Sequence, residues 1–354
     1  MNKTYTAIGI MSGSSLDGLD IAFCSYYFDG KWSYKIIYSK EYSIKCWAER
    51  LKNARSLTNE KLELLDIAFG GFIGESVSEF IQEFSIQNID IVSSHGHTVY
   101  HFPEKGITKQ IGKGKQIFER LKMPILTNLR QADIDLGGSG APIVPIGDLH
   151  LFSEYKYCLN IGGIANVSIK DKKNITAFDI CSANQVLNYF AFLKGKPYDD
   201  NGNLARKGKL NKQLLENLNT LDYYKKKAPK SLDNLFTNQV LKHFKAFDVS
   251  VEDKLNTYVE HIAFQIAETT NYEEKTETIL ITGGGAYNGY LIERISYYLQ
   301  QKNIKVIIPT KETINYKEAL VMAFMGVLYL RKEINCLSSV TGASSNSICG
   351  EFVG

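Results

Sequence analysis

The chain has 354 residues, of which 44% are hydrophobic and 22% are charged, the ordinary balance of a folded globular protein. Its formal net charge of +3 excludes the strongly basic surface by which proteins hold nucleic acids or anionic membranes. The length exceeds what one hydrophobic core usually supports, so we expect two domains that act on a small molecule.

The apolar stretches and the cysteines indicate the compartment. The longest apolar run, residues 319–330, is shorter than the roughly 20 residues of a membrane helix, and the first residues lack the order of a signal peptide. The cysteines show no CxxC or Cys/His spacing, which argues against a zinc site and a disulfide framework. We therefore expect reduced thiols and a cytoplasmic protein.

In chain order, the first third predicts three strands and then a helix. Residues 4–11 and 21–27 are strand formers joined by a small-residue turn, which predicts a β-hairpin, and 32–43 alternates as a third antiparallel strand. Residues 60–87 carry apolar side chains at helical spacing. The elements expected next are a buried strand at 89–93, a helix at 115–121 and a strand at 124–128.

A segment rich in Gly and Pro, residues 135–142, predicts the crossing between two lobes. After it, strands broken by small-residue turns repeat the opening pattern, which favours a doubled α/β fold. The remaining expected elements are strands at 157–161, 167–170, 176–179, 278–282 and 304–308, and helices at 209–247, 253–270, 289–300 and 318–330. We place lobe I at 1–130, lobe II at 131–336, and a C-terminal tail that returns to lobe I at 337–354.

The turn after the first strand has the composition of a phosphate-binding loop. Glycines let backbone N–H groups approach an anion, serines can donate hydrogen bonds, and a carboxylate, Asp17 or Asp20, can hold Mg²⁺ through water. An ordinary hairpin turn is the alternative, because Gly, Ser and Asp also dominate turns. The residues of this candidate ATP loop are Gly13, Ser14, Ser15, Leu16, Asp17, Gly18, Leu19 and Asp20.

A second Gly-rich turn, formed by Gly283, Gly284 and Gly285, precedes a predicted helix and leads to Asn288. The N-terminus of that helix offers N–H donors and a partial positive charge to a phosphate or to adenosine. Tight strand-to-helix packing is the alternative explanation of the glycines. Two such loops, one from each lobe, would hold opposite ends of ATP.

Asp179 lies at the end of a predicted strand, where a carboxylate facing a cleft can act as a general base. The alternative is that Asp179 caps the helix expected to begin near Asn184. Neither reading is preferred on spacing alone.

Arg130 and Asp133 flank the predicted crossing, where a guanidinium can grip a carboxylate or an anionic substrate group; a surface ion pair is the alternative. His95, with His97 and His101, can bind substrate hydroxyls or simply pack. No carboxylate or thiol completes a metal set around these histidines.

These motifs resemble the anhydro-N-acetylmuramic acid kinase family, within the superfamily of sugar kinases, heat-shock ATPases and actin. The resemblance runs over residues 8–343. Its specific stretches are 11–20, 94–101, 110–112, Arg130 with Asp133, 137–145, 160–168, 195–199, 228–231, 283–288 and 317–319.

The resemblance implies a two-lobed, actin-like ATPase fold. Each lobe would be a mixed, ribonuclease H-like sheet flanked by helices, with ATP in the cleft between the lobes. It further implies an enzyme that uses ATP, Mg²⁺ and water to open 1,6-anhydro-N-acetylmuramic acid. Phosphorylation of the freed 6-oxygen would give N-acetylmuramic acid 6-phosphate, a step of cell-wall sugar recycling.

The resemblance also implies residue roles. Asp179 is similar to the base that activates the attacking water, and the first loop is similar to the family's ATP phosphate loop. The expected substrate contacts are His95, Arg130, Asp133, Asn184 and Glu318. The expected partners are the sugar and ATP, with no nucleic acid and no membrane, and a homodimer is left open.

One departure from the family pattern follows Asp179. The family commonly has Asp-Thr-Gly-Pro-Gly-Asn, whereas residues 179–184 read Asp-Ile-Cys-Ser-Ala-Asn. Two alternatives therefore stay open, a kinase of a related sugar and a catalytically weakened nucleotide-binding paralogue.

Overall fold

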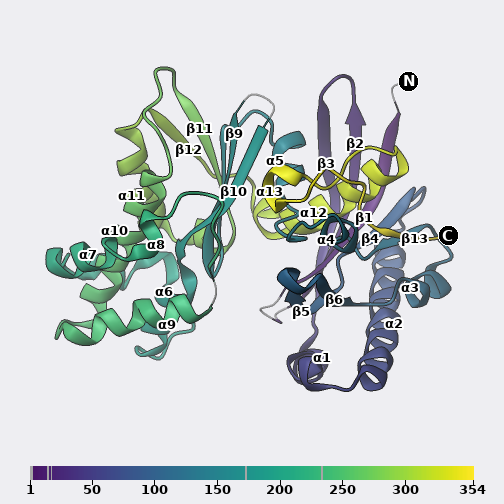
Figure 1. Ribbon diagram of the computed structural model, residues 1–354, viewed down its shortest axis with the longest axis horizontal. Helices are drawn as coiled ribbons and strands as arrows, with labels where there is room; N and C mark the ends of the chain where they lie inside the picture. The colour runs from purple at the N-terminus through teal and green to yellow at the C-terminus, as the bar shows by residue number, and fades with distance from the viewer. Residues whose placement is uncertain (1–2, 14–15, 17, 172–173, 233) are drawn as a thin grey trace. The chain divides into compact units, whose positions relative to one another are not determined.

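The computed structural model describes residues 3–13, 16, 18–171, 174–232 and 234–354 and divides into two compact units. Unit 1 comprises Met1–Leu151 and Tyr316–Gly354, and unit 2 comprises Phe152–Asn315. Each unit has its own sheet and its own hydrophobic core, with helices packed beside the strands (Figure 1).

Unit 1 contains a six-stranded mixed sheet in the order β13-β7-β4-β1-β2-β3. Its strands are β1 (Thr4–Ser12), β2 (Leu19–Phe28), β3 (Trp32–Tyr42), β4 (Ile91–Ser94), β7 (Ile125–Thr127) and β13 (Glu351–Val353). The β1–β2–β3 ladder is antiparallel, whereas β4 runs parallel to β1 and β7 parallel to β4. The predicted hairpin and third antiparallel strand are confirmed.

The other elements of unit 1 cover this sheet and its edge. They are α1 (Lys45–Lys52), α2 (Asn59–Glu83), the hairpin of β5 (His97–Phe102) and β6 (Ile107–Ile111), α3 (Gly114–Leu121), α4 (Gln131–Asp135), α5 (Pro145–His150), most of α12 (Lys311–Leu330) and α13 (Ser338–Thr341). Helix α12 passes so close to β1 that a Cβ on Gly9 would overlap the backbone of Ala319. Glycine at position 9 therefore allows α12 to lie directly on the sheet.

Unit 2 repeats this plan in a five-stranded sheet of order β10-β9-β8-β11-β12. Its strands are β8 (Tyr157–Ile161), β9 (Ile164–Asp171), β10 (Asn174–Ser182), β11 (Glu277–Thr282) and β12 (Ile304–Ile307). Strands β8, β9 and β10 are antiparallel neighbours, and β11 and β12 follow parallel to β8. Both units thus place three antiparallel strands before two parallel ones, and the echo predicted from the sequence is confirmed.

The helices of unit 2 enclose its core. They are α6 (Asn184–Phe192), α7 (Lys212–Asn219), α8 (Asp222–Lys225), α9 (Asn234–His243), α10 (Val251–Glu268) and α11 (Gly289–Gln300). The stretch 209–247, predicted as helical, is broken into three helices by turns. Along the part of the chain that the structure describes, no helix is both long enough and apolar enough to cross a bilayer.

The units divide at other residues than predicted. The boundaries expected at 130/131 and 336/337 lie at 151/152 and 315/316, so 131–151 and 316–336 belong to unit 1. Two contacts explain the difference, because Asp133 accepts a hydrogen bond from Thr341 and Lys317 forms a buried ion pair with Asp148. The Gly- and Pro-rich segment 135–142 is consequently internal to unit 1 and is not the crossing.

Candidate active site

The predicted site residues fall into two sets, one on each unit. Unit 1 carries the β1–β2 loop, His95, Arg130, Asp133 and Glu318. Unit 2 carries Asp179, Asn184, the turn of Gly283, Gly284 and Gly285, and Asn288.

The first predicted ATP loop joins β1 to β2 in unit 1. Strand pairing continues to Ser12 opposite Leu19, and the N–H of Leu16 donates to the Gly13 carbonyl at 3.3 Å. The Ser12 hydroxyl lies 3.3 Å from Nδ1 of His97 on β5. The predicted contacts Ser14, Ser15 and Asp17 lie outside the described residues.

The two described residues at the end of this loop have different roles. Leu19 is fully buried in the core of unit 1, so its side chain packs and does not contact a ligand. Asp20 pairs with Met11 at the start of β2 and is half-buried. A carboxylate at that position has the oxygen ligands that Mg²⁺ takes.

Arg130 precedes α4 and is held from two sides. Its Nε–H donates to Nε2 of His95 at 2.9 Å, and its Nη1 donates to the Gly140 carbonyl at 3.1 Å. Burial lowers the pKa of Arg130 to about 10, while the negative charge of Glu318 acts in the opposite direction. A guanidinium with that pKa stays charged at neutral pH and can hold an anionic or oxygen-rich ligand.

Glu318 lies on α12 beside a buried ion pair that sequence reasoning missed. The Nζ of Lys317 lies 2.7 Å from Oδ1 of Asp148, and both side chains are buried, whereas Glu318 is exposed. Removing one member of a buried pair leaves an uncompensated charge, so the pair fixes α12 against α5. No spacing rule relates positions 148 and 317, although Lys317 stands in a stretch of family resemblance.

Asp133 is an internal support of unit 1. It has no exposed surface, its Oδ2 accepts the Gly140 N–H at 2.8 Å, and its Oδ1 accepts the Thr341 hydroxyl at 2.7 Å. With both oxygens bonded inside the unit, Asp133 joins the segment after α4 to α13 and does not reach a substrate, contrary to the sequence-based expectation.

We expect Asp133→Ala to lower the free energy of unfolding by about 3 kcal/mol, because two buried donors lose a charged acceptor. Urea denaturation followed by circular dichroism measures the change. Asp135→Ala is the matched control, since Asp135 is exposed and bonds only Gln131 among the contacts found. Equal stability of the two variants would show that the buried carboxylate has no supporting role.

Asp179 lies near the end of β10, where the strand bulges between residues 179 and 181 opposite β9. The neighbouring segment binds it closely, because the Asp179 N–H donates to the Lys230 carbonyl at 3.1 Å and Oδ2 accepts the Leu232 N–H at 2.8 Å. The Tyr223 hydroxyl donates to the Asp179 carbonyl at 2.7 Å. The hydrogen bond from Leu232 orients the carboxylate, and the other two fix the backbone that carries it.

The environment of Asp179 suits a base. Burial raises the pKa of its carboxyl group, and the hydrogen bond from Leu232 opposes this. Within the described residues no hydrogen bond to its Oδ1 is found, so this oxygen can receive a proton. The helix-capping alternative is not supported, because α6 begins at Asn184 after Ala183, with no side-chain hydrogen bond at that cap.

The Gly-rich turn of unit 2 lies beside Asn184. The Asn184 Nδ2 donates to the Ile161 carbonyl at 3.3 Å. A Cβ on Gly283 would lie 2.6 Å from Oδ1 of Asn160, and one on Gly285 would overlap Ile161, so packing requires both glycines. Gly284 is exposed, and among the described residues a Cβ there would meet Asn184 alone, with Nδ2 at 3.7 Å. Gly284 is therefore the glycine whose missing side chain leaves room for a ligand.

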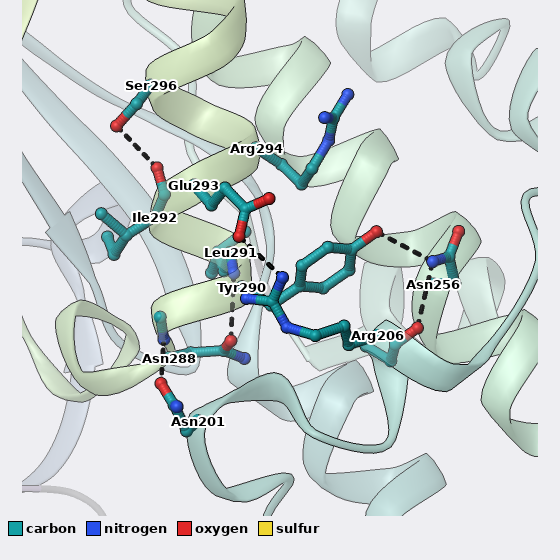
Figure 2. Close-up of polar contacts among 12 residues, drawn as sticks. Asn201, Arg206, Asn256, Asn288, Tyr290, Leu291, Ile292, Glu293, Arg294 and Ser296 are labelled. Carbon is teal, nitrogen blue, oxygen red and sulfur yellow. Dashed lines mark hydrogen bonds and ion pairs between the residues drawn. The ribbon is translucent and has the colours of Figure 1, made fainter.

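Figure 2 shows that two backbone N–H groups at the start of α11 donate hydrogen bonds to asparagine side chains. Oδ1 of Asn288 accepts the Leu291 N–H at 3.0 Å, and Oδ1 of Asn201 accepts the Gly289 N–H at 3.0 Å. Two N–H groups expected to bind a phosphate therefore have partners within the protein. The Oδ1 atom of Asn288 caps α11, and the predicted contact of Asn288 with a nucleotide stays a prediction.

The short 3-10 helix Ala205–Lys207 packs against the start of α11. Arg206 lies over the ring of Tyr290 at 4.7 Å and forms an ion pair with Glu293 at 2.8 Å (Figure 2). Asn256 on α10 donates both to the Tyr290 hydroxyl and to the Ala205 carbonyl. These contacts stiffen the base of α11 and thereby the turn in front of it.

None of the described residues forms a group of three or more His, Cys, Asp or Glu side chains placed to hold a metal ion. The histidines of unit 1 contact the protein instead, with His95 on Arg130 and Gly96, and His101 on Thr108.

The fold and the site residues together define the class of protein to which this chain belongs. Two units with the same order of three antiparallel and two parallel strands form the actin-like ATPase fold to which many sugar kinases belong. A polar set with a hydrogen-bonded arginine on one unit, and a hydrogen-bonded carboxylate and a Gly-rich turn on the other, suit a kinase of small molecules.

The chain belongs to the anhydro-N-acetylmuramic acid kinase family, whose sequence profile matches residues 5–353. It is 30% identical over 378 residues to the anhydro-N-acetylmuramic acid kinase of Sulfurimonas denitrificans, with 99% of each chain covered. The enzyme of that name from Shewanella pealeana is also 30% identical, over 370 residues and 99% of each chain. Among solved structures, a ROK family glucokinase from Streptomyces griseus superposes with a TM-score of 0.43 at 10% identity, over 90% of this chain and 98% of that one.

Proposed function

We propose that the protein is an ATP-dependent kinase that opens 1,6-anhydro-N-acetylmuramic acid with water and phosphorylates the freed 6-oxygen. The product is N-acetylmuramic acid 6-phosphate. The observation that carries the proposal is the family match over residues 5–353. The held Asp179 and Arg130 add residues of suitable chemistry, and the need for ATP assigns the reaction to the cytoplasm.

Asp179 is the general base of this reaction. Its Oδ1 takes a proton from the water that attacks the anomeric carbon, while the bond from that carbon to the 6-oxygen breaks. The 6-oxygen keeps the electron pair of that bond and forms a new bond to the γ-phosphorus, and ADP leaves. One water and one phosphoryl group are thus added to the sugar.

Arg130 and Glu318 hold the sugar, and the loop before Asp20 and the turn at Gly284 contact ATP. Asn184, beside that turn, contacts the sugar from unit 2. Asp20 would contribute an oxygen to Mg²⁺ directly or through water. Mg²⁺ bound with ATP would supply positive charge to the transferred phosphoryl group.

A second candidate function is phosphorylation of a related sugar, and one observation favours it. After Asp179, strand β10 continues through Cys181 to Ser182, and Ile180 lies at the bulge. The family commonly has the turn sequence Thr-Gly-Pro-Gly at these positions. Cys181 and Ala183, which stand where the family has glycines, are both buried and make this turn bulkier than glycines would. A different sugar shape would then be accommodated.

ADP release distinguishes the candidates. The anhydrosugar, open N-acetylmuramic acid and N-acetylglucosamine are each supplied with ATP and Mg²⁺. We expect ADP formation to depend on the anhydrosugar. Faster release with an open sugar would favour the second candidate, and release independent of any sugar would contradict both.

We expect Gly284→Val to weaken binding of a non-hydrolysable ATP analogue by about tenfold or more, because the added side chain fills the space that the proposal gives to the nucleotide. Calorimetric titration measures the affinity. Gly71→Val on α2 is the matched control, since a Cβ there meets no atom of the described residues within 4 Å. Unchanged affinity in the Gly284 variant, with an unchanged melting temperature, would place the nucleotide elsewhere.

A further inference from the structure

The imidazole of His95 is enclosed between the backbone and Arg130. The side chain is 2% exposed, its Nδ1 lies 3.1 Å from the Gly96 carbonyl, and its Nε2 lies 2.9 Å from Nε of Arg130. A carbonyl oxygen can only accept and a guanidinium can only donate. Nδ1 therefore carries the proton, and Nε2 accepts from Arg130.

This arrangement requires a neutral imidazole. A protonated ring would point a second N–H at the guanidinium and place two positive charges in contact. Burial, followed by the charge of Arg130, lowers the pKa of His95 to about 3. The ring consequently stays an acceptor throughout the physiological range of pH.

A second hydrogen bond, made by Nη1, fixes the other side of the Arg130 guanidinium. Nη1 donates to the Gly140 carbonyl, and the Gly140 N–H is itself bonded to the buried carboxylate of Asp133. Among the described residues no hydrogen bond from Nη2 is found, and the side chain keeps some exposed surface. A planar guanidinium fixed through Nε and Nη1 presents its Nη2 group in one direction.

We infer that His95 is a positioning residue, which orients the guanidinium of Arg130 toward the sugar and does not contact the sugar itself. The inference rests on the proposed function, because it concerns the sugar-binding step of that reaction. It replaces the expectation that His95 binds substrate directly. With both ring nitrogens bonded and almost no exposed surface, His95 acts through its neighbour.

Two substitutions of similar size separate the two ring contacts. The amide of Gln reaches the place of Nε2, so His95→Gln keeps an acceptor for Arg130, whereas the amide of Asn reaches only the place of Nδ1. We expect His95→Asn to raise KM for the anhydrosugar about tenfold, the usual value of one hydrogen bond to a charged group. His95→Gln should stay within about threefold of wild type on the same comparison. KM for ATP should be unchanged in both variants.

A double-mutant cycle tests whether the effect passes through Arg130. If it does, adding His95→Asn to the Arg130→Ala protein changes kcat/KM for the sugar no further. Losses that multiply would overturn the inference, as would equal losses for Asn and Gln. Val77→Ala, a truncation in the buried core of unit 1, controls for instability and should leave the sugar KM unchanged.

Nuclear magnetic resonance measures the protonation state and the hydrogen bond of His95 without any enzymatic turnover. In the ¹⁵N spectrum of the histidines, His95 should be the neutral Nδ1–H form at pH 6, and its Nε2 signal should shift in the Arg130→Ala protein. A charged ring, or an Nε2 signal indifferent to Arg130, would overturn the inference even if the anhydrosugar is a substrate. If wild type does not convert the anhydrosugar, the proposed function fails, and this spectrum still decides whether His95 holds Arg130.

Discussion

The Asp179→Asn protein is expected to turn over the anhydrosugar about 10² to 10⁴ times more slowly than wild type, the range that general-base catalysis typically contributes. The amide keeps the shape of the carboxylate, and its oxygen can still accept the hydrogen bond from Leu232. Nucleotide affinity should survive, because Asp179 is assigned to the water and not to ATP. Steady-state kinetics and a separate titration with an ATP analogue measure the two effects.

The pH dependence of kcat/KM gives a second test of Asp179. Since burial raises the pKa of this carboxyl group, the base form is lost as the pH falls through that raised value. Activity should therefore decline on the acid side at a higher pH than for an ordinary aspartate, and this limb should be absent from the residual activity of the Asn variant. Asp248→Asn, at an exposed position, is the matched control. An Asp179→Asn protein as fast as wild type would show that the base is another group.

Arg130→Ala is expected to lower kcat/KM for the sugar by roughly tenfold to a hundredfold, because a charged, forked donor is removed from the proposed sugar site. The loss should appear mainly in KM for the sugar, with KM for ATP unchanged. Initial rates at varied sugar and saturating ATP measure it.

Arg50→Ala is the control for loss of an arginine from the same unit, since Arg50 lies over the Trp47 ring on α1. It should leave the sugar kinetics unchanged. An Arg130→Ala protein with normal sugar KM and raised ATP KM would assign the guanidinium to the nucleotide instead.

The strands of the fold were predictable because burial imposes a period on the sequence. Alternation in 32–43 and the apolar runs around 4–11 and 278–282 gave strands that the structure confirms as β3, β1 and β11. The unit boundary was not predictable in the same way. Gly and Pro mark a turn at 135–142, but they carry no information on which unit the turn packs against, and that depends on Thr341 and α12.

The sequence predicted which residues lie in the candidate site, but it did not predict the role of each residue. Asp179 lies near the end of a strand, as its sequence context indicates. Asp133 and His95 also lie in polar stretches, but their hydrogen bonds are made within the protein. Asp133 binds the backbone at Gly140, and His95 binds Arg130. Thr341, one of the two partners of Asp133, is 208 residues away, a separation over which no local pattern extends. Tyr223, which holds the Asp179 carbonyl from α8, was missed for the same reason.

The product of the complete reaction tests the central claim most directly. The protein is incubated with ATP, Mg²⁺ and 1,6-anhydro-N-acetylmuramic acid, and the sugar and nucleotide products are weighed by mass spectrometry. Our account predicts ADP and a sugar heavier by one water and one phosphoryl group, in equal amounts. A phosphorylated sugar without the added water, or ADP without any sugar phosphate, would contradict it.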